Sequence, residues 1–321
     1  MKKEYYILLA LIIALTAYLF LKKDNQVHYS LPVLEAMDPG SIDKVKITRA
    51  ENTKLLLKKD KTWTVTKDNF PADPQGVRQI LDAITNLKLS ALVSEAGDRV
   101  RYELDPPNAI EVSAFEGSSL KRRFFIGKTA PSLNHTFVMI QKEKQIFQAD
   151  KNFRNKFDKS VDELRNKLVL EFTAKKIQKI TIEKQGLTKV FVLNQPQDTT
   201  KAAEQDLKPV WQLEDGSQAD NTAANDLLSS LSHLSCDNFL DPTDALALEK
   251  TERVCKIVLE NKESLSLNLF ELPDKKTMAG GKSTFSPYAF SLAPYKAKDI
   301  VSYVDTLLGI EPPKEKTPDT D

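Results

Sequence analysis

Cysteine, histidine and glycine are scarce in this sequence, and each scarcity excludes a kind of site. The 321 residues include two cysteines, three histidines and ten glycines. So few cysteines and histidines leave no obvious zinc or haem site. The glycines form neither a Gly-x-Gly-x-x-Gly motif nor a complete Walker loop, and no Gly-x-Ser-x-Gly nucleophile elbow is present. We therefore expect no catalytic residues, no cofactor and no bound metal.

A charge excess of either sign is also lacking. Lysine and arginine number 46 against 45 acids, which gives a net charge of +1. Nucleic-acid-binding proteins usually carry a marked basic excess or a basic face, so we expect no nucleic acid partner. Apolar residues make up 41% and charged residues 28%, as in globular proteins, and the length suits two domains of ordinary size.

The N-terminus contains the one long uncharged run, YYILLALIIALTAYLFL, from Tyr5 to Leu21. As a helix it would be about 25 Å long, close to the hydrocarbon thickness of a bilayer, and lysines flank both ends. A cleaved signal peptide is disfavoured because Leu21-Lys22-Lys23-Asp24 is a poor cleavage site, and an all-apolar run is unusual for a core helix. The sequence thus predicts a single-pass transmembrane anchor over residues 1–23.

The charges around this run bear on its orientation. The lysine pairs on the two sides are equal, and the N-terminal amine tips the count toward a cytoplasmic N-terminus. The short basic leader also resembles the start of a secretory signal. We expect the protein in the inner (cytoplasmic) membrane, with its soluble domains in the periplasm or otherwise outside the cytoplasm.

An internal repeat organises the remaining chain. The segment from Ile42 matches the segment from Ile177 at a constant offset, and the two tryptophans, Trp63 and Trp211, fall on each other. Further along, the apolar helix stripe from Ile80 to Leu87 falls on the stripe from Leu227 to Leu234. A repeat of this length indicates a duplicated domain rather than a solenoid unit.

Each copy has the order strand, strand, strand, helix, then several strands. We predict an α+β fold, with each copy a mostly antiparallel sheet packed by one helix that Asp73 or Asp220 begins. Leu120 pairs with Leu265 in this alignment. The predicted organisation is a connector at 24–40, a first repeat at 41–157, a linker helix at 158–174, a second repeat at 175–309 and a disordered tail at 310–321.

Three groups of residues have both a structural and a functional interpretation. The tryptophans suit a core between sheet and helix, or a ligand-stacking site. Cys236 and Cys255 replace apolar residues of the first copy, which leaves buried thiols, a disulfide, or a redox or metal role open. Gly280-Gly281 lacks the spacing of a phosphate-binding loop and favours a hairpin or a mobile loop.

The basic cluster Lys121-Arg122-Arg123 lies in a predicted strand. Alternation along the strand places Lys121 and Arg123 on one face, which suits a solvated surface. A contact with anionic lipid or with a partner protein is the alternative function for these two residues.

Four segments together resemble the domain-of-unknown-function 4340 family of bacterial proteins. They are Trp63 with Pro71-Ala72-Asp73-Pro74, Tyr102-Glu103-Leu104-Asp105-Pro106, Phe125-Ile126-Gly127, and Asp162-Glu163-Leu164-Arg165-Asn166-Lys167. The resemblance covers most of residues 41–309, although Leu246 to Glu249 replaces the Tyr-x-Leu-Asp-Pro turn in the second copy. The motifs are structural in character. Because such proteins are often encoded beside components of ABC-type transport systems related to gliding motility, the resemblance implies a membrane partner.

Three functions follow as hypotheses. The leading one is a non-enzymatic, membrane-anchored envelope protein that serves as an accessory or scaffold subunit, with an ABC-type permease or ATPase as partner. The alternative is a binding module for a cell-wall polymer, a glycan or a lipid. An enzyme of unknown class is the third.

Overall fold

The structure is a computed structural model that describes residues 3–21, 29–66, 69–141, 143–194, 209–272 and 279–311. The chain divides into two compact units, Met1–Leu164 and Arg165–Asp321. The predicted tail lies outside the described residues from 312 onward, as does the part of the predicted connector up to residue 28.

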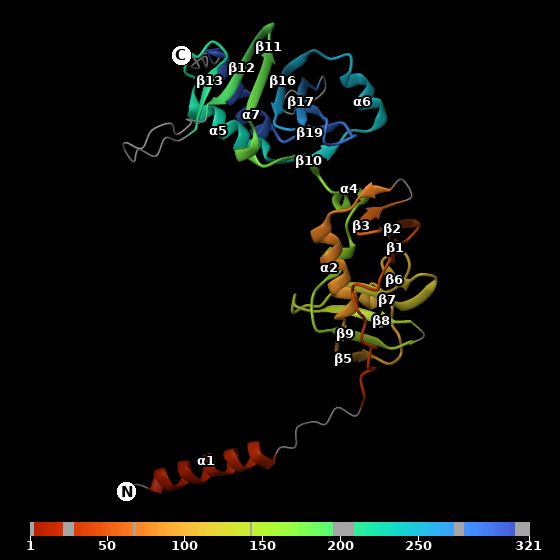
Figure 1. The fold of residues 1–321 in the computed structure, drawn as a ribbon. Helices are drawn as coiled ribbons and strands as arrows, with labels where there is room; N and C mark the ends of the chain where they lie inside the picture. The colour runs from red at the N-terminus through yellow and green to blue at the C-terminus, as the bar shows by residue number, and fades with distance from the viewer. Residues whose placement is uncertain are drawn as a thin grey trace, which may run out of the picture. The chain divides into compact units, whose positions relative to one another are not determined.

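The first unit contains one antiparallel sheet, and α1 and the connector precede it (Figure 1). The strands follow the order β4-β3-β2-β1-β6-β7-β8-β9-β5. The elements of this unit are α1 (Lys3–Leu21), β1 (Lys44–Arg49), β2 (Asn52–Lys59), β3 (Thr62–Val65), β4 (Phe70–Pro71), α2 (Pro74–Thr85), β5 (Leu89–Ser94), the 3-10 turn η1 (Val100–Tyr102), β6 (Ile110–Glu116), β7 (Ser119–Thr129), β8 (Thr136–Ile140), β9 (Ile146–Ala149), α3 (Arg154–Phe157) and α4 (Val161–Leu164).

Helix α2 starts where the sequence predicts and covers the inner face of this sheet. The Asp73 carboxylate accepts hydrogen bonds from the first backbone amides, and Pro74 occupies the first helical position, where no amide is needed. Its apolar stripe, which includes Val77, Ile80 and Ile84, is buried against the strands. The main core of the first unit therefore lies between α2 and the sheet.

The second unit contains a sheet of the same kind, in the order β13-β12-β11-β16-β17-β18-β19-β15. A separate two-stranded sheet joins β10 and β14. The elements are β10 (Leu168–Glu171), η2 (Ala174–Lys176), β11 (Lys179–Lys184), β12 (Leu187–Asn194), β13 (Val210–Leu213), α5 (Asn221–Leu231), β14 (His233–Ser235), β15 (Asn238–Phe239), α6 (Pro242–Leu248), β16 (Arg253–Glu260), β17 (Ser264–Glu271), β18 (Ala279–Ser283), β19 (Phe290–Leu292) and α7 (Pro294–Leu308).

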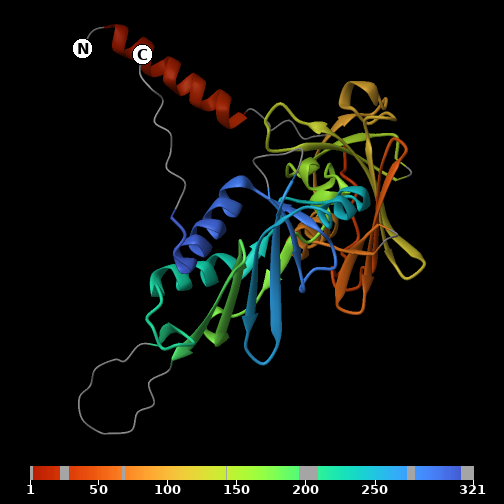
Figure 2. The same cartoon turned by 90° about the horizontal axis from the view of Figure 1, so that it is seen from above.

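Two helices, rather than the predicted one, pack on the second sheet. Helices α5 and α7 lie side by side on one face (Figure 2). The sequence analysis missed α7, although Ile300, Val304 and Leu308 recur at helical spacing and are buried. Mostly antiparallel sheets backed by helices nevertheless make the chain an α+β protein.

The two sheets repeat one strand order, with β4 added in the first unit. Strand β1 pairs with β2 and β6, and β11 pairs with β12 and β16, in equivalent registers. The predicted pairing of Leu120 with Leu265 is wrong. A bulge next to Ala114 shifts β7, so Arg122 lies opposite Ala114 just as Leu265 lies opposite Leu259.

Two further expectations hold only in part because long-range strand pairing determines the local structure. The predicted linker helix at 158–174 is helical only at Val161–Leu164, and Leu168–Glu171 forms β10 because β14 pairs with it. For Gly280 and Gly281, the hairpin is confirmed and the mobile loop is wrong. They lie in β18, between β17 and β19, where a Cβ on Gly280 would be 2.4 Å from Leu248 Cδ1.

Candidate functional site

A row of four side chains crosses the first sheet on the face opposite α2. Strand register places Thr48 beside Glu111, Glu111 beside Phe125, and Phe125 beside Met139. Neighbouring residues on each strand point the other way into the main core, so these four point to the outer face. We call them the outer row.

A loop packs on one side of the outer row and closes a small second core. Leu104 is buried with Phe137, Met139 and Ile146, and the Tyr102 ring meets Phe137 edge to face at 4.8 Å. The loop comes so close to β7 that a Cβ on Gly127 would be 2.2 Å from the Tyr102 carbonyl oxygen. Only glycine permits this approach.

Arg154 fastens the same corner from α3. Its guanidinium donates to the carbonyl oxygens of Gly127 at 2.6 Å and Asn108 at 3.2 Å. Its nearest carboxylates, Glu103 and Asp158, are 3.8 Å away, and burial lowers the pKa of Arg154. The loop, β7 and α3 are thus held together without the outer row.

Beside this loop the outer row forms the floor of an open pocket of about 460 Å³, a size typical of ligand sites. All four outer-row residues line it. The other lining residues are Ala50, Arg99, Leu104, Pro106, Ala109, Ile140, Glu143 and Lys144. The pocket therefore has a largely apolar interior with charged groups around it, and it is the candidate binding site of the first unit.

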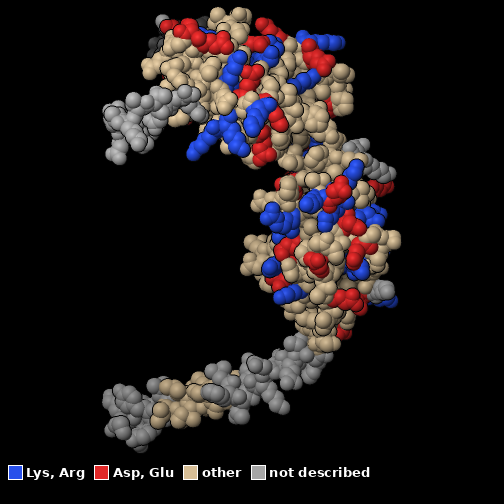
Figure 3. Space-filling model, in the orientation of Figure 1, with Lys and Arg blue, Asp and Glu red and all other residues tan. Residues whose placement is uncertain are grey.

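The predicted contact residues Lys121 and Arg123 lie on β7 between the β6–β7 turn and Phe125, and both are paired with acids. Lys121 contacts Glu116 at 3.2 Å, and Arg123 contacts Glu111 at 2.9 Å. Acidic and basic side chains are intermixed in the same way over the visible surface of both units (Figure 3). The geometry suits the solvated strand face, and a lipid or partner contact at these residues is untested.

Sequence analysis missed the role of Arg122, which lies between them and points into the core. Its guanidinium donates to the carbonyl oxygens of Ile84 and Thr85 at the end of α2, and to that of Glu35. Burial lowers the pKa of Arg122, and the Glu35 carboxylate counteracts part of that effect. A cation at a helix C-terminus is stabilised by the helix dipole.

A second pocket, of about 570 Å³, adjoins the first at Ala50 and is lined by Arg49, Lys54 and Lys159. Arg49 pairs with Asp158 at 2.6 Å, and Lys54 donates to the carbonyl oxygens of Phe157 and Lys159. Burial lowers the pKa of Lys54. These cations anchor the end of α3 to the sheet.

The second unit repeats this anchor with other residues. Lys184 pairs with Asp305 at 2.5 Å, and Lys189 donates to the Leu307 carbonyl oxygen at 3.3 Å on α7. Lys184 and Lys189 occupy the strand positions of Arg49 and Lys54. Because both units use cations here to hold a helix end, we assign this cluster a structural role.

The cysteines and tryptophans are mostly core residues. Cys236 and Cys255 are buried as thiols rather than joined as a disulfide, and burial raises the pKa of Cys255 to about 12. Trp211 is buried and Trp63 is half-buried. A core role therefore suits both tryptophans, and Trp211 is too buried to stack on a ligand.

Neither a metal-binding cluster nor a membrane-spanning helix is found among the described residues. No group of three or more metal-ligating side chains is present among them. No helix within those residues is both long enough and apolar enough to cross a membrane.

Segments far apart in sequence come together in pairs. The Asp73 amide at the start of α2 donates to the Leu164 carbonyl oxygen at 2.8 Å, and Gly127 receives the Tyr102 backbone. Arg165 lies against the rings of Phe239 and Tyr288 in the second unit. Residues from all four segments that carry the family resemblance thus form packing contacts.

The fold defines a two-unit α+β protein in which one sheet design is used twice. A family model described as a domain of unknown function, DUF4340, matches residues 63–252, which is more than half of the chain. The chain belongs to this family. No curated protein and no solved structure matches it.

Proposed function

We propose that this protein is a membrane-tethered accessory or scaffold protein of the cell envelope, which acts by binding rather than by catalysis. The observation that carries the proposal is α1. Its sequence from Tyr5 to Leu21 has no charge, and the side chains described along it, from Leu9 to Tyr18, are exposed and, apart from Thr16 and the hydroxyl of Tyr18, apolar. Such a surface needs an apolar environment.

Binding rather than catalysis is favoured by what the family motifs do. Asp73 begins a helix, Gly127 admits a backbone loop, and Arg165 stacks on aromatic rings. These motif contacts are packing contacts, which favours a scaffold over a catalyst. We propose an ABC-type permease or ATPase as the membrane partner and a periplasmic location for the two units.

Membrane extraction tests the anchor. The full chain should stay in the membrane pellet after alkaline carbonate treatment, and an Ile12→Lys/Ile13→Lys variant should move to the supernatant. Each lysine at the centre of a spanning helix costs about 2.5–3.5 kcal/mol. Val33→Lys is the matched control, because Val33 is 96% exposed and lies beyond α1. Release of the unaltered chain by carbonate would refute the anchor.

Crosslinking tests the partner. After mild crosslinking in cells and detergent extraction, the chain should copurify with a membrane permease or its ATPase, and a reporter at the C-terminus should be active only outside the cytoplasm. A clean monomer after crosslinking would contradict the accessory role. A reporter active in the cytoplasm would contradict the orientation.

A further inference from the structure

In the second unit, the side chains at the positions of the outer row pair with one another or with neighbouring residues. The positions of Thr48, Glu111, Phe125 and Met139 correspond by strand register to Glu183, Lys256, Asn268 and Lys282. All four residues of the second-unit row are polar or charged. In the first unit, only Thr48 and Glu111 are.

The polar side chains of the second-unit row form hydrogen bonds and ion pairs with one another and with neighbouring residues. Glu183 accepts from Lys256 and from Arg253, both at 2.8 Å, and Arg253 lies 3.5 Å from the Asn268 side-chain oxygen. Lys282 pairs with Glu249 at 2.7 Å. The fold is therefore compatible with an internally paired row, and the apolar residues Phe125 and Met139 distinguish the outer row of the first unit from its counterpart.

The rim of the first-unit pocket carries two cations that form no ion pair with any described residue. Glu111 is engaged by Arg123, whereas Arg99 and Lys144 have no carboxylate within ion-pair distance among the described residues. The two come from adjoining segments, because a Cβ on Gly97 would be 2.8 Å from the Lys144 carbonyl oxygen. The lining contains two cations, Arg99 and Lys144, and two acids, Glu111 and Glu143, and Arg123 from outside the lining pairs with Glu111.

We propose that this pocket binds a single-chain anionic amphiphile, a long-chain carboxylate. Its apolar chain would lie over Phe125, Ala109 and Pro106, which line the pocket and are half-buried or exposed, and its carboxylate would lie between Arg99 and Lys144. Burial of the chain supplies the affinity, and the rim cations select the charged head over a neutral one. The proposal rests on the pocket alone and does not depend on α1 as an anchor.

Photolabelling of the full chain tests this proposal. The chain in phosphatidylcholine nanodiscs is irradiated with a diazirine-bearing palmitate, and the labelled peptides are identified by mass spectrometry. Label should appear in peptides that contain Ala109 or Phe125. Palmitate should compete for the label, and hexadecanol and acetate should not. Equal competition by hexadecanol would overturn the role of the cations, and label confined to α1 would overturn the pocket.

Variants separate the pocket from the rim. Ala109→Phe fills the pocket and should lower labelling by about tenfold, which corresponds to about 1.4 kcal/mol. Val254→Phe places the same ring at the equivalent position of the second unit and should leave labelling within about twofold of the unaltered chain. Circular dichroism checks that both variants fold. Equal labelling of Ala109→Phe and the unaltered chain would overturn the proposal.

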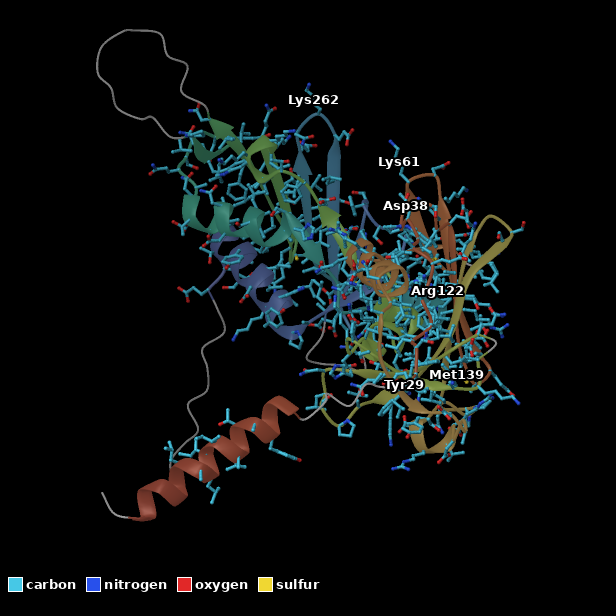
Figure 4. The ribbon with its side chains drawn as sticks, turned by 90° about the horizontal axis from the view of Figure 1, so that it is seen from below. Tyr29, Asp38, Lys61, Arg122, Met139 and Lys262 are labelled. Carbon is cyan, nitrogen blue, oxygen red and sulfur yellow. The ribbon has the colours of Figure 1, made fainter. Side chains whose placement is uncertain are left out.

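The charge variant is Arg99→Glu/Lys144→Glu, which should also lower palmitate labelling by about tenfold. Lys59→Glu/Lys61→Glu changes the net charge equally at the β2–β3 turn, and Figure 4 shows Lys61 well away from Met139. This control should label normally. Equal losses in both variants would show that net charge, rather than the pocket rim, attracts the probe, and would overturn the proposal.

Discussion

The two units place a glycine and an aromatic ring at the same two positions of neighbouring strands, but in exchanged order. In the first, glycine lies on β7, where Gly127 admits the loop backbone, and the neighbouring strand supplies the ring of Phe137. In the second, the ring of Phe270 is on β17 and the glycine, Gly280, is on β18, where Leu248 of α6 approaches. In each unit, the glycine therefore allows a neighbouring segment to pack on part of the outer face of the sheet. The comparison separates what the sheet requires from what each unit adds.

Each unit also contains one tryptophan, which allows the units to be followed separately. Trp211→Phe leaves Trp63 as the reporter of the first unit, and Trp63→Phe leaves Trp211 as the reporter of the second. All unfolding experiments below use these two backgrounds in denaturant. They give a free energy of unfolding for each unit wherever its transition is two-state.

The largest effect is expected from glycine substitution. Gly127→Ala should destabilise the first unit by about 3 kcal/mol, because the new methyl group meets a backbone oxygen that cannot move without the loop. Gly280→Ala should cost less in the second unit, because its contact is the end of the Leu248 side chain. Equal losses of unfolding free energy in Gly127→Ala and Gly280→Ala would contradict the expected difference between the two units. Gly40→Ala, whose methyl group would meet the Asp38 carboxylate at 3.2 Å, is the mild control.

Exchange of Arg122 for the residue of the second unit should have the next largest effect. Arg122→Leu places leucine where Leu265 stands, but it leaves the carbonyl oxygens of Ile84, Thr85 and Glu35 without their donor. We expect a loss of about 2 kcal/mol in the first unit. Arg123→Leu, one residue further along β7, removes a surface cation and should cost about 0.5 kcal/mol. Similar costs for the two variants would contradict the buried role of Arg122.

The helix anchors should differ because their burial differs. Lys184 and Asp305 have side chains that are 9% and 17% exposed, against 41% and 33% for Arg49 and Asp158. Asp305→Asn should cost the second unit about 1–2 kcal/mol, because it leaves a shielded lysine unpaired. Asp158→Asn should cost the first unit about 0.5 kcal/mol, since an exposed pair contributes little. The reverse order in unfolding measurements would break the comparison.

Local sequence signals predicted the elements that depend on local chemistry. Asp73 and Pro74 fix the start of α2, and the alternation of β1 and β2 recurs in β11 and β12. The sequence did not predict the pairing of strands that are far apart along the chain. No local signal shows that β14 will convert the predicted linker helix into β10, or that a bulge beside Ala114 will shift β7.

The candidate pocket illustrates the same limit. Thr48, Glu111, Phe125 and Met139 are far apart in sequence, and only the register of four strands makes them neighbours. The repeat itself contained part of the signal, because a correct alignment sets Phe125 against Asn268 and Met139 against Lys282. Because the bulge beside Ala114 shifts β7, the alignment made from the sequence did not show this contrast.

The smallest effect at neutral pH is expected at Cys255, which stands in β16 where Ile110 stands in β6. Cys255→Val keeps an apolar group of similar size and should change the stability of the second unit by less than about 1.5 kcal/mol. The pKa of Cys255 rises from 9.0 to about 12 on burial, so the folded chain keeps its thiol proton while the unfolded chain loses it.

Above pH 9 the Cys255 thiol therefore binds fewer protons in the unfolded state than in the folded state, and its contribution to the free energy of unfolding falls as pH rises toward 12. The Cys255→Val variant lacks this contribution, so the unaltered chain should lose stability relative to the variant over that range, in denaturant titrations followed by Trp211. Iodoacetamide at pH 8 should leave Cys255 unmodified in the folded chain, because a buried thiol is not a nucleophile. Parallel pH profiles for the two proteins, or rapid alkylation of Cys255, would show that this position is not the sealed core site that the register with Ile110 implies.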